Sequence, residues 1–417
     1  MEKEKSVDPS VSPTALPTAA PSAKPGEMIA AALCAVGAER AASQELRRLG
    51  LRVKESGFGR VRFCSTLAGL YRALLALRTV DRVLLEAGHF PARDFDALFE
   101  GTRAVPWEEY LGPDMGLAVD KVRSNRSVLK AETSIQAVVH KAAVERLCGV
   151  RGIRRLPDGG KKANLRVYVE KDEVSLLLDL SGEPLFKRGY RPEGGDAPLR
   201  ETTAAALLIL SLWRRKFPLY DPFCGSGTIL AEAALYAWDA APGLGRRFAL
   251  EDLLIADPAL EKSIRAELLG RVNFEHTVRI AGSDRDPRAL SLAAANLQRA
   301  RDLARGGDAG GSAGPALPAL RCLPMEEARP PFDGAAGPGG EGFIVTNPPY
   351  GKRLGDPEDA ESCYAGMALL RRGFPGWKLG VITNHPGFES FFGRGADSCR
   401  EISNGAVQSY FFQYQSL

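Results

Sequence analysis

The spacing of hydrophobic and polar positions changes along the chain, and these changes divide it into regions. In residues 28–90, apolar or alternating stretches at 29–36 and 53–63 are interleaved with helical spacing at 39–49 and 67–77. A period of two residues is typical of strands, and a period of about 3.6 is typical of helices. The order strand, helix, strand, helix predicts a small ferredoxin-like domain over residues 28–90.

A second mixed α and β region follows at residues 91–190. Its stretch 134–147 has helical spacing and gathers its aliphatic side chains on one face. Alternating segments at 165–170 and 174–180 then predict two strands. We therefore expect a second small module between the ferredoxin-like domain and the rest of the chain.

From about residue 219 onward, the pattern repeats strand, turn and helix. We expect strands at 219–223, 278–283, 343–346, 379–383 and 408–413, and helices at 201–213, 228–238 and 287–300. This alternation predicts a doubly wound, mainly parallel α/β sheet over residues 191–417. The ligands of such sheets bind beyond the carboxyl ends of the strands.

Two segments have the composition of chain without fixed structure. Residues 1–27 are rich in Pro, Ser, Ala and Lys, so we expect a disordered tail, with Met28 as an alternative start of the protein. Residues 306–342 are rich in Gly, Pro and Ala and are interpreted as a flexible insertion between strands.

The distribution of charge indicates a polyanionic partner. At 417 residues the chain is long enough for two or three domains, and its net charge is only +4. Residues 121–166, however, contain 12 Lys and Arg against 3 Asp and Glu. Such a block favours an RNA-binding module, with a merely solvated basic face as the alternative. The candidate RNA-binding residues are Lys121, Arg123, Arg126, Lys130 and Lys141.

The cysteines and the hydropathy exclude several classes of protein. The seven cysteines include no CxxC pair and no histidine at ligand spacing. This pattern argues against a disulfide framework and a zinc site, so we expect no metal and a reducing, cytoplasmic location. No apolar run approaches the length of a membrane span, and we expect no membrane partner.

The first motif with chemical content is DPFCGSGT at residues 221–228, between an expected strand and an expected helix. A glycine-rich turn lets the backbone approach a ligand closely at the electropositive start of a helix. The motif lacks the Lys-Ser/Thr of a phosphate-binding loop and is not GxGxxG. Asp221 can instead complement the sulfonium or the amino group of S-adenosylmethionine. A tight turn without a ligand is the alternative.

The second motif is GSDRDP at residues 282–287. An acidic side chain that closes a strand can accept both hydroxyls of a ribose, and we assign this role to Asp284. Asp286 is better interpreted as the cap of the following helix, because Pro287 suits the first helical position.

The third motif is IVTNPPYG at residues 344–351. The lone pair of an exocyclic base amine is delocalised into the ring, so that nitrogen is a poor nucleophile. The side-chain oxygen of Asn347 and the carbonyl of Pro348, held rigid by Pro348 and Pro349, can accept both amine hydrogens and aim the lone pair at a methyl group. Tyr350 can stack on a base taken out of its helix.

The three motifs, extended to NPPYGKRLGD, resemble the family of THUMP-domain RNA methyltransferases that modify large-subunit ribosomal RNA. FPGW at 374–377, ITNH at 382–385 and FGRGA at 392–396 resemble the end of that family. Residues 178–199 resemble its linker, and residues 121–147 resemble the core of its THUMP domain. In all, the resemblance covers roughly residues 28–417.

The resemblance implies a fold, a reaction and a set of site residues. The fold is a Rossmann-like class I methyltransferase domain with a mainly parallel seven-stranded sheet, preceded by ferredoxin-like and THUMP modules. The reaction is methylation of the N2 amine of a guanine, with 23S ribosomal RNA as the implied partner. The expected catalytic residues are Asn347, Pro348, Pro349 and Tyr350. The expected residues for S-adenosylmethionine are Asp221, Phe223, Cys224, Gly225, Gly227, Asp284 and Glu326.

The chain departs from the family pattern at one place. Members usually carry an acidic residue after the third strand, in contact with the adenine of the cofactor. Here the region reads CLPME, with Pro324 at the expected position. Either Glu326 substitutes for the acidic residue or that contact is missing.

Two other functions remain open at this stage. The same site chemistry suits the N6 amine of adenine in DNA or RNA, or the side-chain amide of a glutamine, although the basic block argues against a protein substrate. An RNA-binding protein without catalytic activity is the alternative from a different class, and Pro324 is the feature that favours it.

Overall fold

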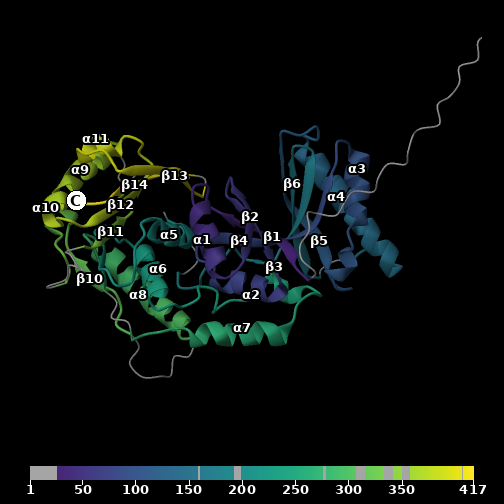
Figure 1. Ribbon diagram of the computed structural model, residues 1–417, viewed down its shortest axis with the longest axis horizontal. Coiled ribbons are helices and arrows are strands. Elements are labelled where there is room, and N and C mark those ends of the chain that lie inside the picture. Colours follow the sequence, from purple (N-terminus) through teal and green to yellow (C-terminus); the bar gives the residue numbers. More distant parts are fainter. Residues whose placement is uncertain are drawn as a thin grey trace, which may run out of the picture. The chain divides into compact units, whose positions relative to one another are not determined.

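The computed structural model describes residues 26–157, 160–191, 199–275, 279–306, 315–332, 341–349, 357–405 and 407–417. The described chain forms two compact units (Figure 1). One unit comprises residues 86–178, and the other comprises residues 26–85 together with residues 179–417.

The N-terminal part of the larger unit has the ferredoxin-like arrangement. It consists of β1 (Met28–Cys34), α1 (Glu39–Arg48), β2 (Arg52–Gly57), β3 (Arg60–Ser65), α2 (Leu67–Ala76) and the first part of β4 (Val80–Pro91), whose residues from Glu86 onward belong to the smaller unit. The strand order is β2-β3-β1-β4, and β1 pairs antiparallel with both β3 and β4. The prediction of a single strand over residues 53–63 was wrong. Phe58 and Gly59 form a tight turn that converts this stretch into the hairpin β2–β3.

The smaller unit contains α3 (Phe95–Ala104), β5 (Gly116–Asn125), α4 (Glu132–Arg151), β6 (Lys162–Glu170) and β7 (Glu173–Asp179), whose last residue belongs to the larger unit. Strand β6 pairs parallel with β5 and antiparallel with β7. Helix α4 buries Ile135, Val139 and Leu147 on one side, so the predicted apolar face is confirmed. The helix ends at Gly152, whose φ of 64° lies in the left-handed region that favours glycine.

The rest of the larger unit is an α/β domain with a seven-stranded sheet. Its strands are β8 (Leu219–Asp221), β9 (Ile280–Asp284), β10 (Ala319–Cys322), β11 (Phe343–Thr346), β12 (Lys378–Thr383), β13 (Ser398–Asn404) and β14 (Val407–Tyr414). They follow the order β10-β9-β8-β11-β12-β14-β13. The first five are parallel, and β14 is antiparallel to its two neighbours. The predicted mainly parallel sheet is confirmed.

Two hydrophobic clusters cover the two faces of this sheet. Side chains of β11 alternate between them, because successive residues of a strand point to opposite faces: Phe343 and Val345 join one cluster and Ile344 joins the other. The first cluster includes α5 (Glu201–Leu210), α6 (Thr228–Ala237) and α8 (Pro287–Ala304). The second includes α9 (Pro357–Gly366), α10 (Leu370–Gly373) and α11 (Phe388–Phe392). Helix α7 (Pro258–Gly270) packs against α2.

The interpretation of residues 306–342 as an insertion without structure was wrong for its described part. Residues 319–322 form β10, which pairs in parallel with β9, and residues 325–327 form a short 3-10 helix. Residues 307–314 and 333–340 lie outside the described residues, as do residues 1–25 of the expected tail. The four-residue strand β10 was missed because it is short and only its pairing with β9 identifies it.

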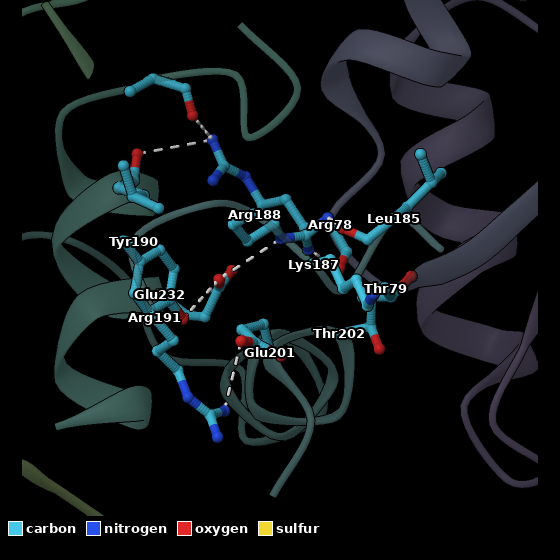
Figure 2. Close-up of polar contacts among 12 residues, drawn as sticks. Arg78, Thr79, Leu185, Lys187, Arg188, Tyr190, Arg191, Glu201, Thr202 and Glu232 are labelled. Atoms are coloured by element: carbon cyan, nitrogen blue, oxygen red, sulfur yellow. Dashed lines mark hydrogen bonds and ion pairs between the residues drawn. The ribbon is translucent and has the colours of Figure 1, made fainter. Parts of the chain in front are cut away.

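A buried polar network joins the ferredoxin-like domain to the α/β domain within the larger unit (Figure 2). Arg78, from the turn before β4, donates to the carbonyl of Ala240 at 2.6 Å. Arg188 donates to the carbonyls of Leu185 and Arg78 and lies 3.5 Å from Glu232 Oε1. Glu232 on α6 has no exposed surface, so its charge depends on these partners. Among the described residues, no helix is both long and apolar enough to span a lipid bilayer.

Candidate active site

Two backbone amides of the turn after β8 donate hydrogen bonds to the neighbouring strand β9. The amide of Cys224 donates to the carbonyl of Ser283 at 2.9 Å, and the amide of Gly225 donates to Asp284 Oδ2 at 2.9 Å. Gly225 has a φ of 51°, a conformation that a side chain would disfavour. A side chain at Gly282 would lie 2.8 Å from Cys224 Cβ, so glycine there lets the turn pack closely on β9.

Asp221 ends β8 and lies almost completely buried beneath this turn. Its Oδ1 accepts hydrogen bonds from the Thr346 hydroxyl at 2.6 Å and from the Phe223 amide at 3.1 Å. Burial raises the pKa of Asp221 to about 7, and the charge of Asp284 adds to this rise, while the two hydrogen bonds oppose it. A carboxyl group with this pKa readily exchanges its proton for a cationic ligand near neutral pH.

Asp284 ends β9, the strand next to β8. Its Oδ1 accepts a hydrogen bond from the amide of Asp286 at 3.0 Å, and its Oδ2 accepts one from the amide of Gly225. Each oxygen keeps a second lone pair for a ligand hydroxyl. Asp286 caps α8 through the amide of Arg288, and Pro287 occupies the start of the helix, so the predicted cap is confirmed.

Asn347 follows β11, the strand on the other side of β8. Its Oδ1 is buried and has no hydrogen-bond partner among the residues that the structure describes. A buried carbonyl oxygen without a partner costs free energy, so an unpaired acceptor is a sign of a group that awaits a ligand. Asn347 lines the same cavity as Asp221.

A cavity of about 670 Å³ lies at the carboxyl ends of β8, β9, β10 and β11. Among the described residues of its wall, five contribute carboxyl groups, Asp221, Asp284, Asp286, Glu326 and Asp359, and Arg285 contributes the one guanidinium. This balance favours a cationic ligand. The cavity is also large enough for a nucleoside-sized molecule, because ligand pockets span roughly 300–1,000 Å³.

Most of the expected site residues line this cavity. They are Asp221, Phe223, Cys224, Gly225, Asp284, Glu326, Asn347 and Pro349. Pro324 lines it as well, together with Glu326, so an acidic group is present close to the point where the family pattern is broken. Burial raises the pKa of the Cys224 thiol well above its ordinary range, which suits a packing role.

Three expected residues do not belong to the cavity wall as described. Gly227 is absent from the wall; a side chain there would lie 3.1 Å from Ala293 Cβ, so the glycine permits α6 to pack on α8. Pro348 is buried away from the wall. Tyr350 lies outside the described residues, and its role stays a prediction.

Sequence reasoning missed several residues of the wall. Ser226, Thr228 and Arg285 belong to the motifs already identified, so the motifs themselves indicated these positions. Asp359, Ser362 and Cys363 come from α9, which carries no recognisable motif. Helix α9 reaches the cavity through packing, since Ala360 and Tyr364 share a hydrophobic cluster with Met325.

The candidate RNA-binding residues lie in the smaller unit. Lys121 and Arg123 are on β5, Arg126 follows it, and Lys130 precedes α4. Arg123 forms an ion pair with Glu132 at 3.0 Å. Lys141 is on α4, and its ammonium group lies over the ring of Phe99, 5.7 Å from the ring centre. Arg126 and Lys130 are exposed and make no ion pair within the described chain. Among the described residues, no group of three His, Cys, Asp or Glu side chains is arranged to hold a metal ion.

Three family models match the chain along its length. An RlmL ferredoxin-like domain matches residues 30–84, a THUMP domain matches residues 92–179, and an RMKL-like methyltransferase domain matches residues 188–304 and 338–411. The crystal structure of SMU.472 complexed with SAH superposes with a TM-score of 0.81 at 32% identity, and covers 94% of this chain and 99% of that one.

Two relatives from known genomes are similar over most of this chain. "Putative RNA methyltransferase YpsC" of Bacillus subtilis (strain 168) is 33% identical over 387 residues, covering 92% of this chain and 95% of that protein. "Ribosomal RNA large subunit methyltransferase K/L" of Cellvibrio japonicus is 34% identical, covering 92% of this chain, which spans only 50% of that protein. The chain thus belongs to the family of methyltransferases that combine an RlmL ferredoxin-like domain, a THUMP domain and an RMKL-like methyltransferase domain.

Proposed function

We propose that this protein uses S-adenosylmethionine to methylate the exocyclic N2 amine of a guanine in 23S ribosomal RNA. Its methyltransferase domain and its likeness to SMU.472, crystallised with SAH, identify it as a methyltransferase that depends on S-adenosylmethionine. The cavity fits this cationic cofactor, because carboxyl groups outnumber arginine side chains among the wall residues that the structure describes. In this proposal residues 191–417 carry the chemistry and residues 28–190 bind the RNA.

The observation that carries the proposal is Oδ1 of Asn347, which is buried and has no hydrogen-bond partner in the part of the chain that the structure describes. An exocyclic amine donates two hydrogen bonds, and an acceptor held beside Asp221 is the partner that such an amine needs. Thr346 bonds to Asp221 directly before Asn347, so the acceptor and the cofactor carboxylate are fixed to the same pair of strands.

In this proposal each residue of the cavity contacts a different part of the cofactor. S-adenosylmethionine supplies an electrophilic methyl group on a cationic sulfur when it is bound. Asp221 holds a negative charge for the cationic part of the cofactor, Asp284 accepts from the ribose hydroxyls, and Glu326 accepts from the adenine amine. We assign these roles from the chemistry of each side chain and its place on the wall.

On the substrate side, Asn347 Oδ1 and the carbonyl of Pro348 accept both hydrogens of the base amine. This geometry withdraws the nitrogen lone pair from the ring and fixes its direction, which is an orientation effect and needs no strong base. The rigid proline pair keeps the acceptors in place before the base arrives. Tyr350 stacks on the base after it leaves its helix.

RNA as the substrate is supported by the THUMP domain, by the basic block and by the names of the relatives. The K/L relatives are named for large-subunit ribosomal RNA, and this supports the choice of 23S RNA. Because all seven cysteines are free thiols, we place the enzyme in the reducing cytoplasm. Guanine N2 rests on the family resemblance, since Asn347 would accept equally from the N6 amine of adenine.

The decisive experiment uses purified full-length protein and deproteinised 23S RNA from a strain that lacks this gene. The RNA is incubated with S-adenosylmethionine labelled in its methyl group, digested to nucleosides and analysed by mass spectrometry. We expect N2-methylguanosine with the wild-type protein. Asn347→Ala should bind S-adenosylmethionine normally in calorimetry. Its turnover should fall by several orders of magnitude, because the variant can no longer orient the substrate amine.

Each contrary outcome identifies the part of the proposal that fails. If the product were N6-methyladenosine, the assignment of the site would stand, but the substrate base would be adenine and not guanine. If calorimetry detected no heat when S-adenosylmethionine is added, the protein would instead be an RNA-binding protein without catalytic activity. Near-normal methyl transfer by Asn347→Ala would refute the assignment of the amine acceptor.

A further inference from the structure

Phe58 occupies an unexpected position at the tip of the β2–β3 hairpin. Its side chain is 95% exposed. Gly57 pairs with Arg60, so Phe58 and Gly59 are the two residues of the loop, with φ angles of 48° and 71°. Positive φ at both positions is the type I′ turn, which favours Asn-Gly and disfavours a bulky first residue. Neither the turn nor the packing accounts for a phenylalanine here.

The hairpin tip is held firmly in place. The amide of Gly59 donates to Glu39 Oε1 at 2.6 Å, and its carbonyl accepts from the amide of Cys34 at 2.8 Å. Glu39 Oε2 also accepts from the amide of Gly37 at 2.9 Å. The backbone that carries the ring is therefore already ordered, and a partner that binds the ring would not have to order this loop.

The hairpin tip lies by the edge of the catalytic sheet at which the cavity is found. Directly beyond Cys34, the backbone of Val36 exchanges two hydrogen bonds of 3.0 Å with Ser403, through the amide and the hydroxyl of that serine. Ser403 is next to the end of β13, where Asn404 pairs with Val407 of β14. Because Thr383 at the carboxyl end of β12 pairs with Tyr410, this β13–β14 turn lies at the carboxyl edge of the sheet.

The same edge carries the end of β11, because Thr346 pairs with Val381 of β12. From β11 to β13 there are three strand spacings, which amount to about 15 Å. A few nucleotides of single-stranded RNA span a distance of this order. A strand that delivers its base to Asn347 can therefore continue along the edge to the hairpin.

The charge of the hairpin favours a nucleic acid over other partners. Strands β2 and β3 carry four basic side chains, Arg52, Lys54, Arg60 and Arg62. Two acids partly offset their charge, because Glu27 pairs with Arg52 at 2.7 Å and Glu55 pairs with Arg62 at 3.5 Å, and the balance of the hairpin stays positive. Exposed aromatic rings among basic side chains bind single strands by stacking on bases, while the positive charge attracts the backbone. A single exposed hydrophobic residue is otherwise ordinary, so it is the disfavoured turn conformation together with the charge that points to a ligand.

We propose that Phe58 stacks on an unpaired base of the RNA outside the cavity, so that the ferredoxin-like domain reads the strand flanking the target. The inference rests on the proposed function only in that the substrate is RNA. It assigns a second contact region, carried by a domain other than the catalytic domain and distinct from the basic block of residues 121–166.

Phe58→Asn is the sharpest test, because asparagine suits the left-handed turn and the variant should unfold no earlier than the wild type. We expect the KM for deproteinised 23S RNA, and its Kd in filter binding, to rise about tenfold, as loss of one stacked base predicts. Phe58→Trp should restore binding, because it keeps an aromatic face. Leu254→Asn is the matched control, since Leu254 is 56% exposed elsewhere in the same unit, and it should change neither constant.

The inference is overturned if Phe58→Asn leaves both constants within twofold of the wild type, or if Phe58→Trp binds as weakly as Phe58→Asn. Filter binding separates this failure from failure of the proposed function. If the wild type methylates RNA and Phe58→Asn binds it normally, only the stacking contact is refuted. If the wild type methylates no RNA but binds it through Phe58, the contact stands and the proposed reaction falls.

Discussion

The hydroxyl of Thr346 donates a 2.6 Å hydrogen bond to Oδ1 of Asp221, and the two residues end neighbouring parallel strands. This bond joins the motif that we propose to hold the cofactor to the motif that we propose to hold the substrate amine. The two bonded residues are 125 positions apart in the chain. Their meeting at one edge of the sheet is the geometric condition on which methyl transfer between them depends.

Binding of S-adenosylmethionine should weaken as the pH falls below 7. Burial raises the pKa of Asp221 from 3.8 to about 7, so below pH 7 a proton must leave before the carboxylate can face the cationic cofactor. The affinity should therefore fall by up to about tenfold per pH unit between pH 7 and pH 5.5. Calorimetry in two buffers with different ionisation enthalpies would detect the released proton. An affinity independent of pH in this window would contradict the role of Asp221.

Asp221→Asn should stabilise the protein at high pH while it weakens cofactor binding. The folded-state pKa of Asp221 lies above the unfolded value, so ionisation opposes folding increasingly between pH 3.8 and pH 7, and fully above pH 7. The variant lacks this cost, and its gain in unfolding free energy over the wild type should reach on the order of a few kcal/mol at pH 8. Urea unfolding at pH 5 and pH 8 measures the gain. A difference that does not grow with pH would show that Asp221 is not strained by burial of its charge.

Thr346→Val should shift the pH dependence of cofactor binding upward. The hydroxyl bond from Thr346 lowers the pKa of Asp221, so its removal should raise that pKa further above 7. Valine keeps the shape of the side chain, so the strand pairing should persist. The midpoint of the affinity profile should move to higher pH, with Asp221→Asn as the control that has no midpoint. An unmoved midpoint would mean that another group titrates.

The network around Glu232 should be a main support of the contact between the ferredoxin-like and α/β domains. Glu232→Ala leaves Arg188 buried without its carboxylate and the Tyr190 hydroxyl without its 3.0 Å acceptor (Figure 2). Breaking a buried pair in this way costs roughly 3–5 kcal/mol of unfolding free energy. Arg188→Met combined with Glu232→Leu should cost less than the sum of the two single changes, which a double-mutant cycle measures.

A surface pair in the same unit serves as the control for this network. Arg247 contacts Glu251 at 2.8 Å, but the side chain of Arg247 is 73% exposed. Exposed pairs contribute little because water screens them and holding two long side chains costs entropy. Arg247→Met should leave the unfolding midpoint essentially unchanged. If Glu232→Ala were equally harmless, the buried network would not hold the two domains.

The sequence predicted that residues of the three motifs would meet at one cavity, because the motifs lie where parallel strands end. Asp221 and Asp284 are the last residues of short strands, Asn347 directly follows another, and the carboxyl ends of parallel strands share one edge. The local motifs and the general topology of parallel sheets were therefore sufficient to predict that these three residues lie close together. Asp359 and Cys363 could not be found in this way, because only packing of α9 on the Met325 cluster brings them to the wall.

The errors in the fold prediction share a physical cause. Strand β10 lies in a stretch of glycine, proline and alanine, and its pairing with β9 stabilises it more than its own composition. The hairpin at Phe58 was missed because the alternation of residues 53–63 continues through the turn, and phenylalanine is not a turn residue. Both cases reflect tertiary context that overrides local preference.

RNA binding through the smaller unit should depend on Arg126 and Lys130 more than on Arg123. Each phosphate contact contributes about 0.9 to the slope of log affinity against log salt concentration for a duplex, and about 0.7 for a single strand. Arg126 and Lys130 are exposed without an ion pair in the described chain, whereas Arg123 must first release Glu132 at 3.0 Å. Neutralising Arg126 and Lys130 to glutamine should therefore flatten the slope by about one to two, and Arg123→Gln should flatten it by less.

Arg146→Gln is the matched control, because Arg146 belongs to the same basic block but is paired with Glu108. Filter binding of 23S RNA over a range of potassium chloride concentrations measures all the slopes. Since a change confined to phosphate contacts weakens binding to every sequence equally, an unrelated RNA should lose the same factor. A slope unchanged by the double variant would place the RNA away from the β5–α4 connection.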